Sequence, residues 1–177
     1  MSFIGEVKKG TVLAPAYFLA CGDEEIIRET RQAAQNSALV KETKDGKYIP
    51  AGTAYPSNDA NAIGLLYEDV DVTCGDMPAS VITGGDVVVY EDRLAITGES
   101  YDAVTPETGD NPAEEGWYER SGSAGAYVYT LTTDTTVDSQ KTYYAKSDVR
   151  LAPAAKTALA ALGFKFIATA PAVTRPY

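Results

Sequence analysis

Short runs of β-forming residues, each closed by turn residues, are the feature that most constrains the fold of this chain. From Lys47 onward, apolar runs end repeatedly at proline, glycine or acidic residues. Runs this short cannot build a helix with one buried face, and their spacing is typical of a small β-sandwich or barrel-like core. The chain is therefore predicted to be mainly β. The expected strands are Lys47–Pro50, Thr53–Pro56, Ala62–Tyr67, Val81–Thr83 and Val87–Tyr90.

Two other segments carry helical signals. Pro153 stands before an alanine-rich run that ends at Gly163, which predicts one short C-terminal helix followed by a strand. Residues 23–38 are interpreted as a second helix, because adjacent glutamates near its start suit the positive end of a helix dipole.

A pair of related segments interrupts the core. Tyr101–Arg120 and Tyr127–Lys146 align without a gap at an offset of 26 residues (127 − 101), and each reads as strand, acidic loop, strand. The phrase Arg-Leu-Ala stands on both sides, at 93–95 and 150–152, as expected where an insertion splits a loop. Residues 98–149 are predicted to form an inserted β minidomain of two repeats. The alternative is that they add strands to one larger sheet.

The chain is thus divided into three parts. Residues 1–22 are predicted to be an extended N-terminal arm, since glycine and proline break them into pieces too short for a stable helix. Residues 23–97 and 150–177 form the β-rich core, and residues 98–149 form the insert. The apolar side chains of the arm pack either on the chain's own core or on a partner.

Charge excludes several classes of partner. The net charge is −10 at pH 7, which argues against a general affinity for nucleic acid or for an anionic membrane. No run is long and apolar enough to insert into a membrane, and the first residues lack the pattern of a signal peptide. The charge is uneven: residues 98–149 hold ten acidic and three basic residues, whereas residues 150–177 hold four basic residues and no acidic one.

The chain contains no histidine. The usual general base, the usual zinc ligand and every Ser-His or Cys-His nucleophile are therefore missing. Carboxylate, lysine or tyrosine chemistry would need a recognisable motif, and none is present. The sequence predicts a protein that is not an enzyme and that has no cofactor; an unusual carboxylate-based hydrolase has little support.

Some acidic residues could form a metal site, and the two cysteines could form a disulfide. Asp69, Asp71 and Asp76 could act as ligands of a hard cation, but their spacing lacks the full calcium-loop pattern and favours solvated strand ends. No metal site is predicted. Cys21 and Cys74 are interpreted as two buried or free thiols rather than as a bridge.

Aromatic residues gather in the insert at equivalent places of the two repeats. They form either an aromatic platform for a sugar or peptide, or a set of cross-strand pairs that pack on one another. These ligand-binding candidates are Trp117, Tyr118, Tyr143 and Tyr144.

Several phrases of the core occur in an order typical of one family. They are Gly10–Tyr17, Tyr48–Thr53, Tyr55–Ala60, Ile63–Val72 and Ala161–Ile167. With the insert removed, the chain resembles the tailed-phage head fibre and capsid decoration proteins over residues 7–97 and 150–177. The insert's phrases look like a module scattered through phage structural proteins.

The resemblance implies a place and a partner rather than a chemistry. It implies a structural virion protein made in the bacterial cytoplasm and carried on the outer capsid surface. Its partners would be the major capsid protein and copies of itself, in a homo-oligomer that is expected to be a trimer. The alternative is an adhesin-like module whose insert recognises a glycan on the host surface. The candidates for capsid contact lie in the arm: Lys8, Lys9, Val12, Leu13, Tyr17 and Phe18.

Overall fold

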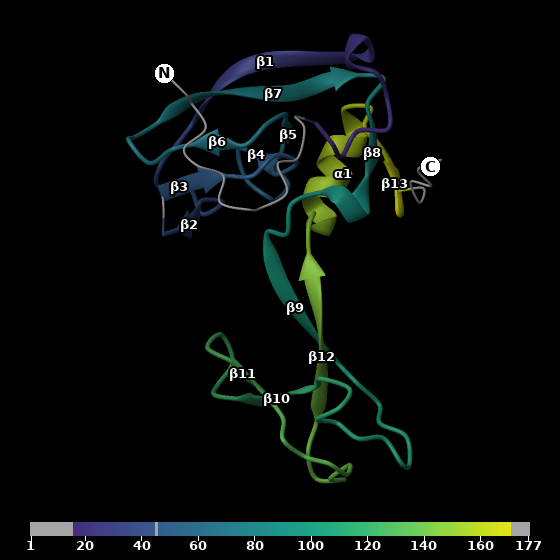
Figure 1. Ribbon diagram of the computed structural model, residues 1–177. Coiled ribbons are helices and arrows are strands. Elements are labelled where there is room, and N and C mark those ends of the chain that lie inside the picture. Colours follow the sequence, from purple (N-terminus) through teal and green to yellow (C-terminus); the bar gives the residue numbers. More distant parts are fainter. Residues whose placement is uncertain (1–15, 45, 171–177) are drawn as a thin grey trace, which may run out of the picture. The chain divides into compact units, whose positions relative to one another are not determined.

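The computed structural model describes residues 16–44 and 46–170 of the chain (Figure 1). Its internal contacts divide the protein into two compact units. One unit, here called the core, holds the chain on both sides of residues 98–149. The other, here called the insert, is Gly98–Val149 and has the same bounds as the predicted minidomain.

In its described residues the core has the α-helix α1 (Pro153–Ala161) and the short 3-10 helices η1 (Asp23–Glu25) and η2 (Glu91–Arg93). The strands of the core are β1 (Ile26–Ala33), β2 (Lys41–Thr43), β3 (Gly46–Ile49), β4 (Ala54–Tyr55), β5 (Gly64–Leu66), β6 (Val70–Asp71), β7 (Met77–Gly85), β8 (Val88–Tyr90) and β13 (Lys165–Ile167). The strands of the insert are β9 (Gly98–Ala103), β10 (Tyr118–Ser121), β11 (Val128–Leu131) and β12 (Tyr143–Val149).

The prediction of a mainly β protein is confirmed. The core contains sheets with the strand orders β1-β7-β5-β4, β2-β3-β6 and β13-β8, and the insert contains the sheet β11-β10-β12-β9. Among the described residues these sheets stay open, and none closes into a barrel. Each strand predicted in the core has a counterpart, and Val81–Thr83 turns out to be the middle of the longer β7.

The predicted helix at residues 23–38 is wrong. Only the short η1 is helical there, and the chain continues as β1 beside β7, from the pair Ile26 and Gly85 to the pair Ala33 and Met77 (Figure 1). Most of β1 is exposed, so its sequence shows no buried strand face. Backbone pairing with a distant strand decides the conformation here and overrides the weak helical signal.

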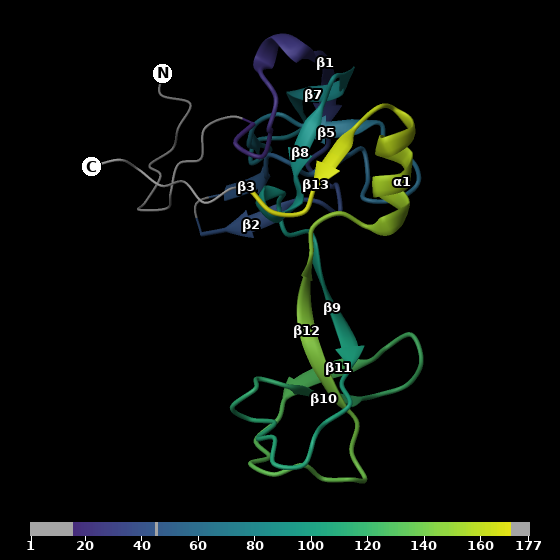
Figure 2. The same ribbon diagram turned by 90° about the vertical axis from the view of Figure 1, so that its right-hand side faces the viewer.

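The predicted C-terminal helix is confirmed and lies on the core. Strands β8 and β13 are parallel, and a parallel pair needs a crossover connection, which α1 supplies (Figure 2). Ala155 and Leu159 on α1 are buried in the main apolar cluster. The insert lies between β8 and α1 in the sequence. It is therefore an extension of this crossover connection.

A polar clamp in the core closes the base of the insert. The Thr97 hydroxyl donates a hydrogen bond to the Arg150 carbonyl over 3.0 Å, so the two ends of the insert are held together. The Asn58 amide nitrogen donates to the Thr97 hydroxyl over 2.7 Å, and the Ala152 N–H donates to the Asn58 side-chain oxygen over 2.8 Å. Thr97 and Arg150, the core residues on either side of the insert, are therefore held together by contacts within the core.

The main apolar cluster is built around side chains from distant parts of the sequence. Phe18 and Leu94 are buried, and both lie against the turn at Gly52. Gly52 has a φ of 74°, and a Cβ there would lie 3.1 Å from the Phe18 ring. A glycine is needed at this turn because of its left-handed backbone and because the aromatic ring approaches it closely.

Candidate functional site

The predicted capsid contacts fall into two groups. Lys8, Lys9, Val12 and Leu13 lie outside the described residues. Phe18 is fully buried in the core, and Tyr17 is half-buried with its ring edge-on to Phe18 at 5.9 Å. The interpretation of Phe18 as a capsid contact is therefore corrected: no part of its ring is free for a partner. Burial is also the main cause that raises the pKa of Tyr17, and the negative charge of Asp69 adds to it.

The aromatic candidates in the insert also differ in exposure. Tyr143 and Tyr144 are buried, so neither can present a ring face to a ligand. Trp117 and Tyr118 are half-buried and line a shallow, open depression that also includes Glu115, Lys146 and Asp148. A single platform of four exposed rings, as the sequence suggested, is not formed. Tyr143 and Tyr144 pack inside the insert, as the cross-strand alternative predicted, whereas Trp117 and Tyr118 keep accessible surface.

The two repeats of the insert form one sheet by exchanging strands. Strands β9 and β10 of the first repeat do not pair with each other; each pairs with strands of the second repeat. Tyr118 and Tyr144, which are equivalent in the two repeats, lie opposite one another at the centre of the sheet. An antiparallel pair of equivalent residues marks an approximate twofold axis, so the insert resembles an internal dimer.

Four tyrosine rings on one face follow this twofold relation. Tyr101 and Tyr118 meet edge to face at 5.2 Å and 74°, and Tyr129 and Tyr144 do the same at 5.3 Å and 77°. Tyr101 and Tyr129 stack on each other at 3.9 Å and 4°. Ring pairs of this kind add about 0.5–1.5 kcal/mol each beyond their buried area. The cluster gives a small acidic sheet an apolar centre.

The register corrects the gapless alignment of the repeats. Arg120 lies opposite Tyr129, and its equivalent Lys146 lies opposite Tyr101. The cations are 26 residues apart (146 − 120), but the tyrosines are 28 apart (129 − 101). The second repeat therefore has a connecting loop two residues shorter (28 − 26), and Tyr129 rather than Tyr127 is the structural equivalent of Tyr101.

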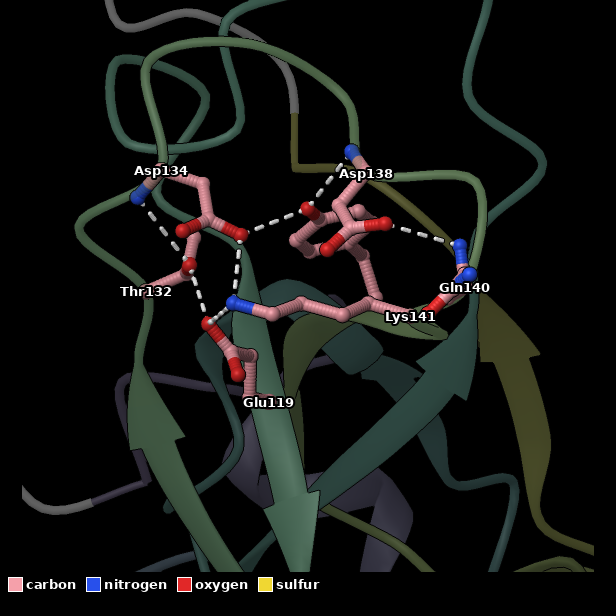
Figure 3. Close-up of polar contacts among 7 residues, drawn as sticks. Glu119, Thr132, Asp134, Asp138, Gln140 and Lys141 are labelled. Carbon is pink, nitrogen blue, oxygen red and sulfur yellow. Dashed lines mark hydrogen bonds and ion pairs between the residues drawn. The ribbon is translucent and has the colours of Figure 1, made fainter.

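A polar network fixes the loop of the second repeat (Figure 3). Lys141 donates to Asp134 over 2.8 Å and to Glu119 over 3.1 Å, and Thr132 donates to the same oxygen of Glu119 over 2.6 Å. The Tyr143 hydroxyl donates to Asp134 over 2.7 Å. The hydrogen bond from Lys141, together with that from Tyr143, lowers the pKa of Asp134, and the carboxylates raise the pKa of Lys141. Lys141, Asp134 and Glu119 are thus paired with one another, and the network joins the loop to the sheet.

Two of the acidic residues that could act as cation ligands accept hydrogen bonds from backbone N–H groups in turns. Asp69 accepts a hydrogen bond from the Ala51 N–H over 2.7 Å, and Asp71 accepts one from the Thr73 N–H over 2.9 Å. Within residues 16–44 and 46–170, no group of acidic residues and cysteines is arranged to hold a metal ion. Cys21 is partly buried and Cys74 is exposed, and both are free thiols.

Comparisons with protein-family models, with curated proteins and with solved structures found no match. None of the helices in the described part of the chain has the length and apolar character needed to span a bilayer. By its fold, the protein is a mainly β protein whose crossover connection carries an inserted, internally repeated β sheet.

Proposed function

We propose that this protein is a structural virion protein that decorates the outer surface of a phage head. In this role it binds the major capsid protein and stabilises or extends the shell. The proposal rests on the family resemblance of the core and on one structural observation, which is that both ends of the described chain meet the core at the same place.

That place is the end of β8 and the adjoining η2. The Tyr90 N–H donates to the Phe18 carbonyl over 2.8 Å, on the N-terminal side. The Ala170 N–H donates to the Asp92 carboxylate over 2.9 Å, on the C-terminal side. Phe18 and Ala170, which lie near the two limits of the described residues, are therefore held by the same part of the core, which suits a docking surface formed there.

Charge supports this orientation. The insert has a net charge of −7 (3 − 10), whereas residues 150–177 carry four positive charges and no negative one. A docking face benefits from the absence of like-charge crowding, while a projecting unit gains solubility from charge of one sign. In the proposed arrangement the chain ends face the shell, and the insert is not needed for attachment.

Self-association is part of the proposal. A small β core gains stability when it buries apolar surface against copies of itself, and the family resemblance implies a trimer. The core has exposed apolar side chains that such contacts would cover, among them Ile27, Ile63 and Ile167.

A second candidate function is an adhesin-like role for the insert. It is favoured by the half-buried Trp117 and Tyr118, which line an open depression together with charged side chains. Aromatic rings beside polar groups are suited to sugars, because a sugar ring has apolar faces and a polar edge.

Copy number separates the two functions. If the protein decorates capsids, purified particles should carry it at a high and regular number of copies set by the shell lattice, measured by quantitative mass spectrometry against the major capsid protein. A few copies per particle, or release as a soluble monomer that binds glycans, would favour the adhesin and count against decoration.

A further inference from the structure

One end of the insert sheet contains a carboxylate held by a cation and a tyrosine. The Lys146 ammonium lies 2.5 Å from one oxygen of Glu99, and the Tyr101 hydroxyl donates to the other oxygen over 2.8 Å. The hydrogen bond from Lys146 and then that from Tyr101 lower the pKa of Glu99. The insert thus shows, within its own fold, how a cation and a hydroxyl on neighbouring strands bind a carboxylate.

The twofold-related end also has a cation and a tyrosine at the equivalent positions, but it has no carboxylate in place of Glu99. Arg120 replaces Lys146, and Tyr129 replaces Tyr101 at the same register. The residue two positions before the tyrosine, which is Glu99 at the first end, is Tyr127 here.

Arg120 is the exception among the insert's three cations. Lys141 pairs with Glu119 and Asp134, and Lys146 pairs with Glu99. Among the described residues, Arg120 has no carboxylate partner; its guanidinium lies over the Tyr127 ring at 4.3 Å and over the Tyr144 ring at 4.9 Å. The insert has ten acidic side chains, yet none of them pairs with Arg120.

We propose that Arg120 and the Tyr129 hydroxyl bind the carboxylate of an acidic sugar, such as a uronic or sialic acid, as Lys146 and the Tyr101 hydroxyl bind Glu99 at the other end. The guanidinium already contacts the rings of Tyr127 and Tyr144, so less side-chain freedom is lost on binding than for a free arginine. A charge-assisted hydrogen bond from arginine to a carboxylate is stronger than a neutral one.

The neighbouring ring indicates a sugar rather than a simple anion. Tyr127 is 43% exposed and stands directly beside Arg120, so a sugar ring attached to the bound carboxylate can lie against accessible aromatic surface. This inference does not rest on capsid attachment. It supplies a ligand class for the adhesin alternative, at a site different from the depression lined by Trp117.

The test is a titration of the purified full-length chain, followed by NMR of backbone amides or by calorimetry. Glucuronate and N-acetylneuraminate are compared with glucose, which lacks the carboxylate, and with acetate, which lacks the ring. We expect saturable binding of the acidic sugars, with shifts at residues 120 and 127–129, and at least about tenfold weaker binding of glucose and acetate. Failure of both acidic sugars to bind, or acetate binding as tightly as glucuronate, would overturn the proposal.

Variants test the site itself. Arg120→Gln should weaken binding at least about tenfold, whereas Arg31→Gln, at an exposed arginine of the core that pairs with Glu29, should leave it unchanged. Tyr127→Glu places a carboxylate where Glu99 stands in the first repeat, so it should block the site; Tyr127→Gln should cost only about two- to fivefold. Should Arg120→Gln disturb folding, the Tyr127 pair still decides the matter. Equal affinity of the two Tyr127 variants would contradict the assignment.

Discussion

Replacement of Phe18 by alanine is expected to lower the free energy of unfolding of the core by about 3–5 kcal/mol, the range for truncating a buried aromatic residue. Phe18 has no exposed surface, and its ring lies against the Gly52 turn and the Leu94 side chain within the main apolar cluster. A loss of this size is a large fraction of the stability of a typical domain. Chemical denaturation followed by circular dichroism measures it.

A second variant tests whether the loss of stability comes from the burial of the side chain or only from its apolar character. Ile27 is also a large apolar residue in the N-terminal part of the core, but it is 58% exposed on β1. Ile27→Ala should change stability by no more than about 0.5 kcal/mol. If Phe18→Ala leaves stability unchanged yet weakens attachment to capsids, Phe18 is a partner contact after all, and its placement in the core is wrong.

Tyr144→Ala is expected to destabilise the insert by a similar amount, about 3–5 kcal/mol, while the core keeps its stability. Tyr144 is buried on the central strand of the insert sheet, where its ring contacts Tyr129 and Arg120 and faces Tyr118 across the strands. Since the insert and the core are separate compact units, the loss should stay within the insert. Amide hydrogen exchange distinguishes the units: protection should fall in β10–β12 and persist in β1 and β7.

The control for this variant is Tyr144→Phe, which keeps the ring and removes only the hydroxyl. It should retain most of the stability, because the ring makes the aromatic contacts that hold the cluster together. Equal loss of protection in β1 and β7 with Tyr144→Ala would show that the two units unfold as one.

Local sequence signals predicted much of the fold. The strands β3, β4, β5 and β8 and the helix α1 were expected, because apolar alternation, prolines and the glycine after the helix act over a few residues. Strand β1 was missed because its pairing with β7 is non-local and most of its side chains are exposed. The sequence contains no local signal for a strand whose paired residues lie 44 (77 − 33) to 59 (85 − 26) positions further along the chain.

The candidate site was predictable only in part. The repeats and the equivalence of Arg120 and Lys146 follow from the sequence alone. The equivalence of Tyr101 and Tyr129 does not, because it depends on a loop two residues shorter in the second repeat, which only the strand register reveals. The state of Arg120, which has no carboxylate partner among the described residues, is seen only in the contacts of the structure. The register adds that Tyr127 stands where Glu99 stands in the first repeat.

The burial of Phe18 likewise could not be predicted from the sequence. An apolar residue such as Phe18 has the same sequence signal whether it packs on its own core or on a partner. The structure places it inside, so an arm deletion must stop short of Ala16 and Phe18, which are both buried in the core.

We propose that the core attaches the protein to the capsid and that the insert is dispensable for attachment. Residues 98–149 are replaced by a short Gly-Ser linker, which the Thr97 and Arg150 clamp makes feasible, and binding to particles that lack the protein is measured by co-sedimentation. We expect this variant to bind at the occupancy of the full chain. We also expect that deletion of residues 1–15, or neutralisation of Lys8 and Lys9, weakens binding. If the insert replacement abolishes attachment while the arm deletion binds normally, attachment through the core is contradicted, and the insert makes the capsid contact.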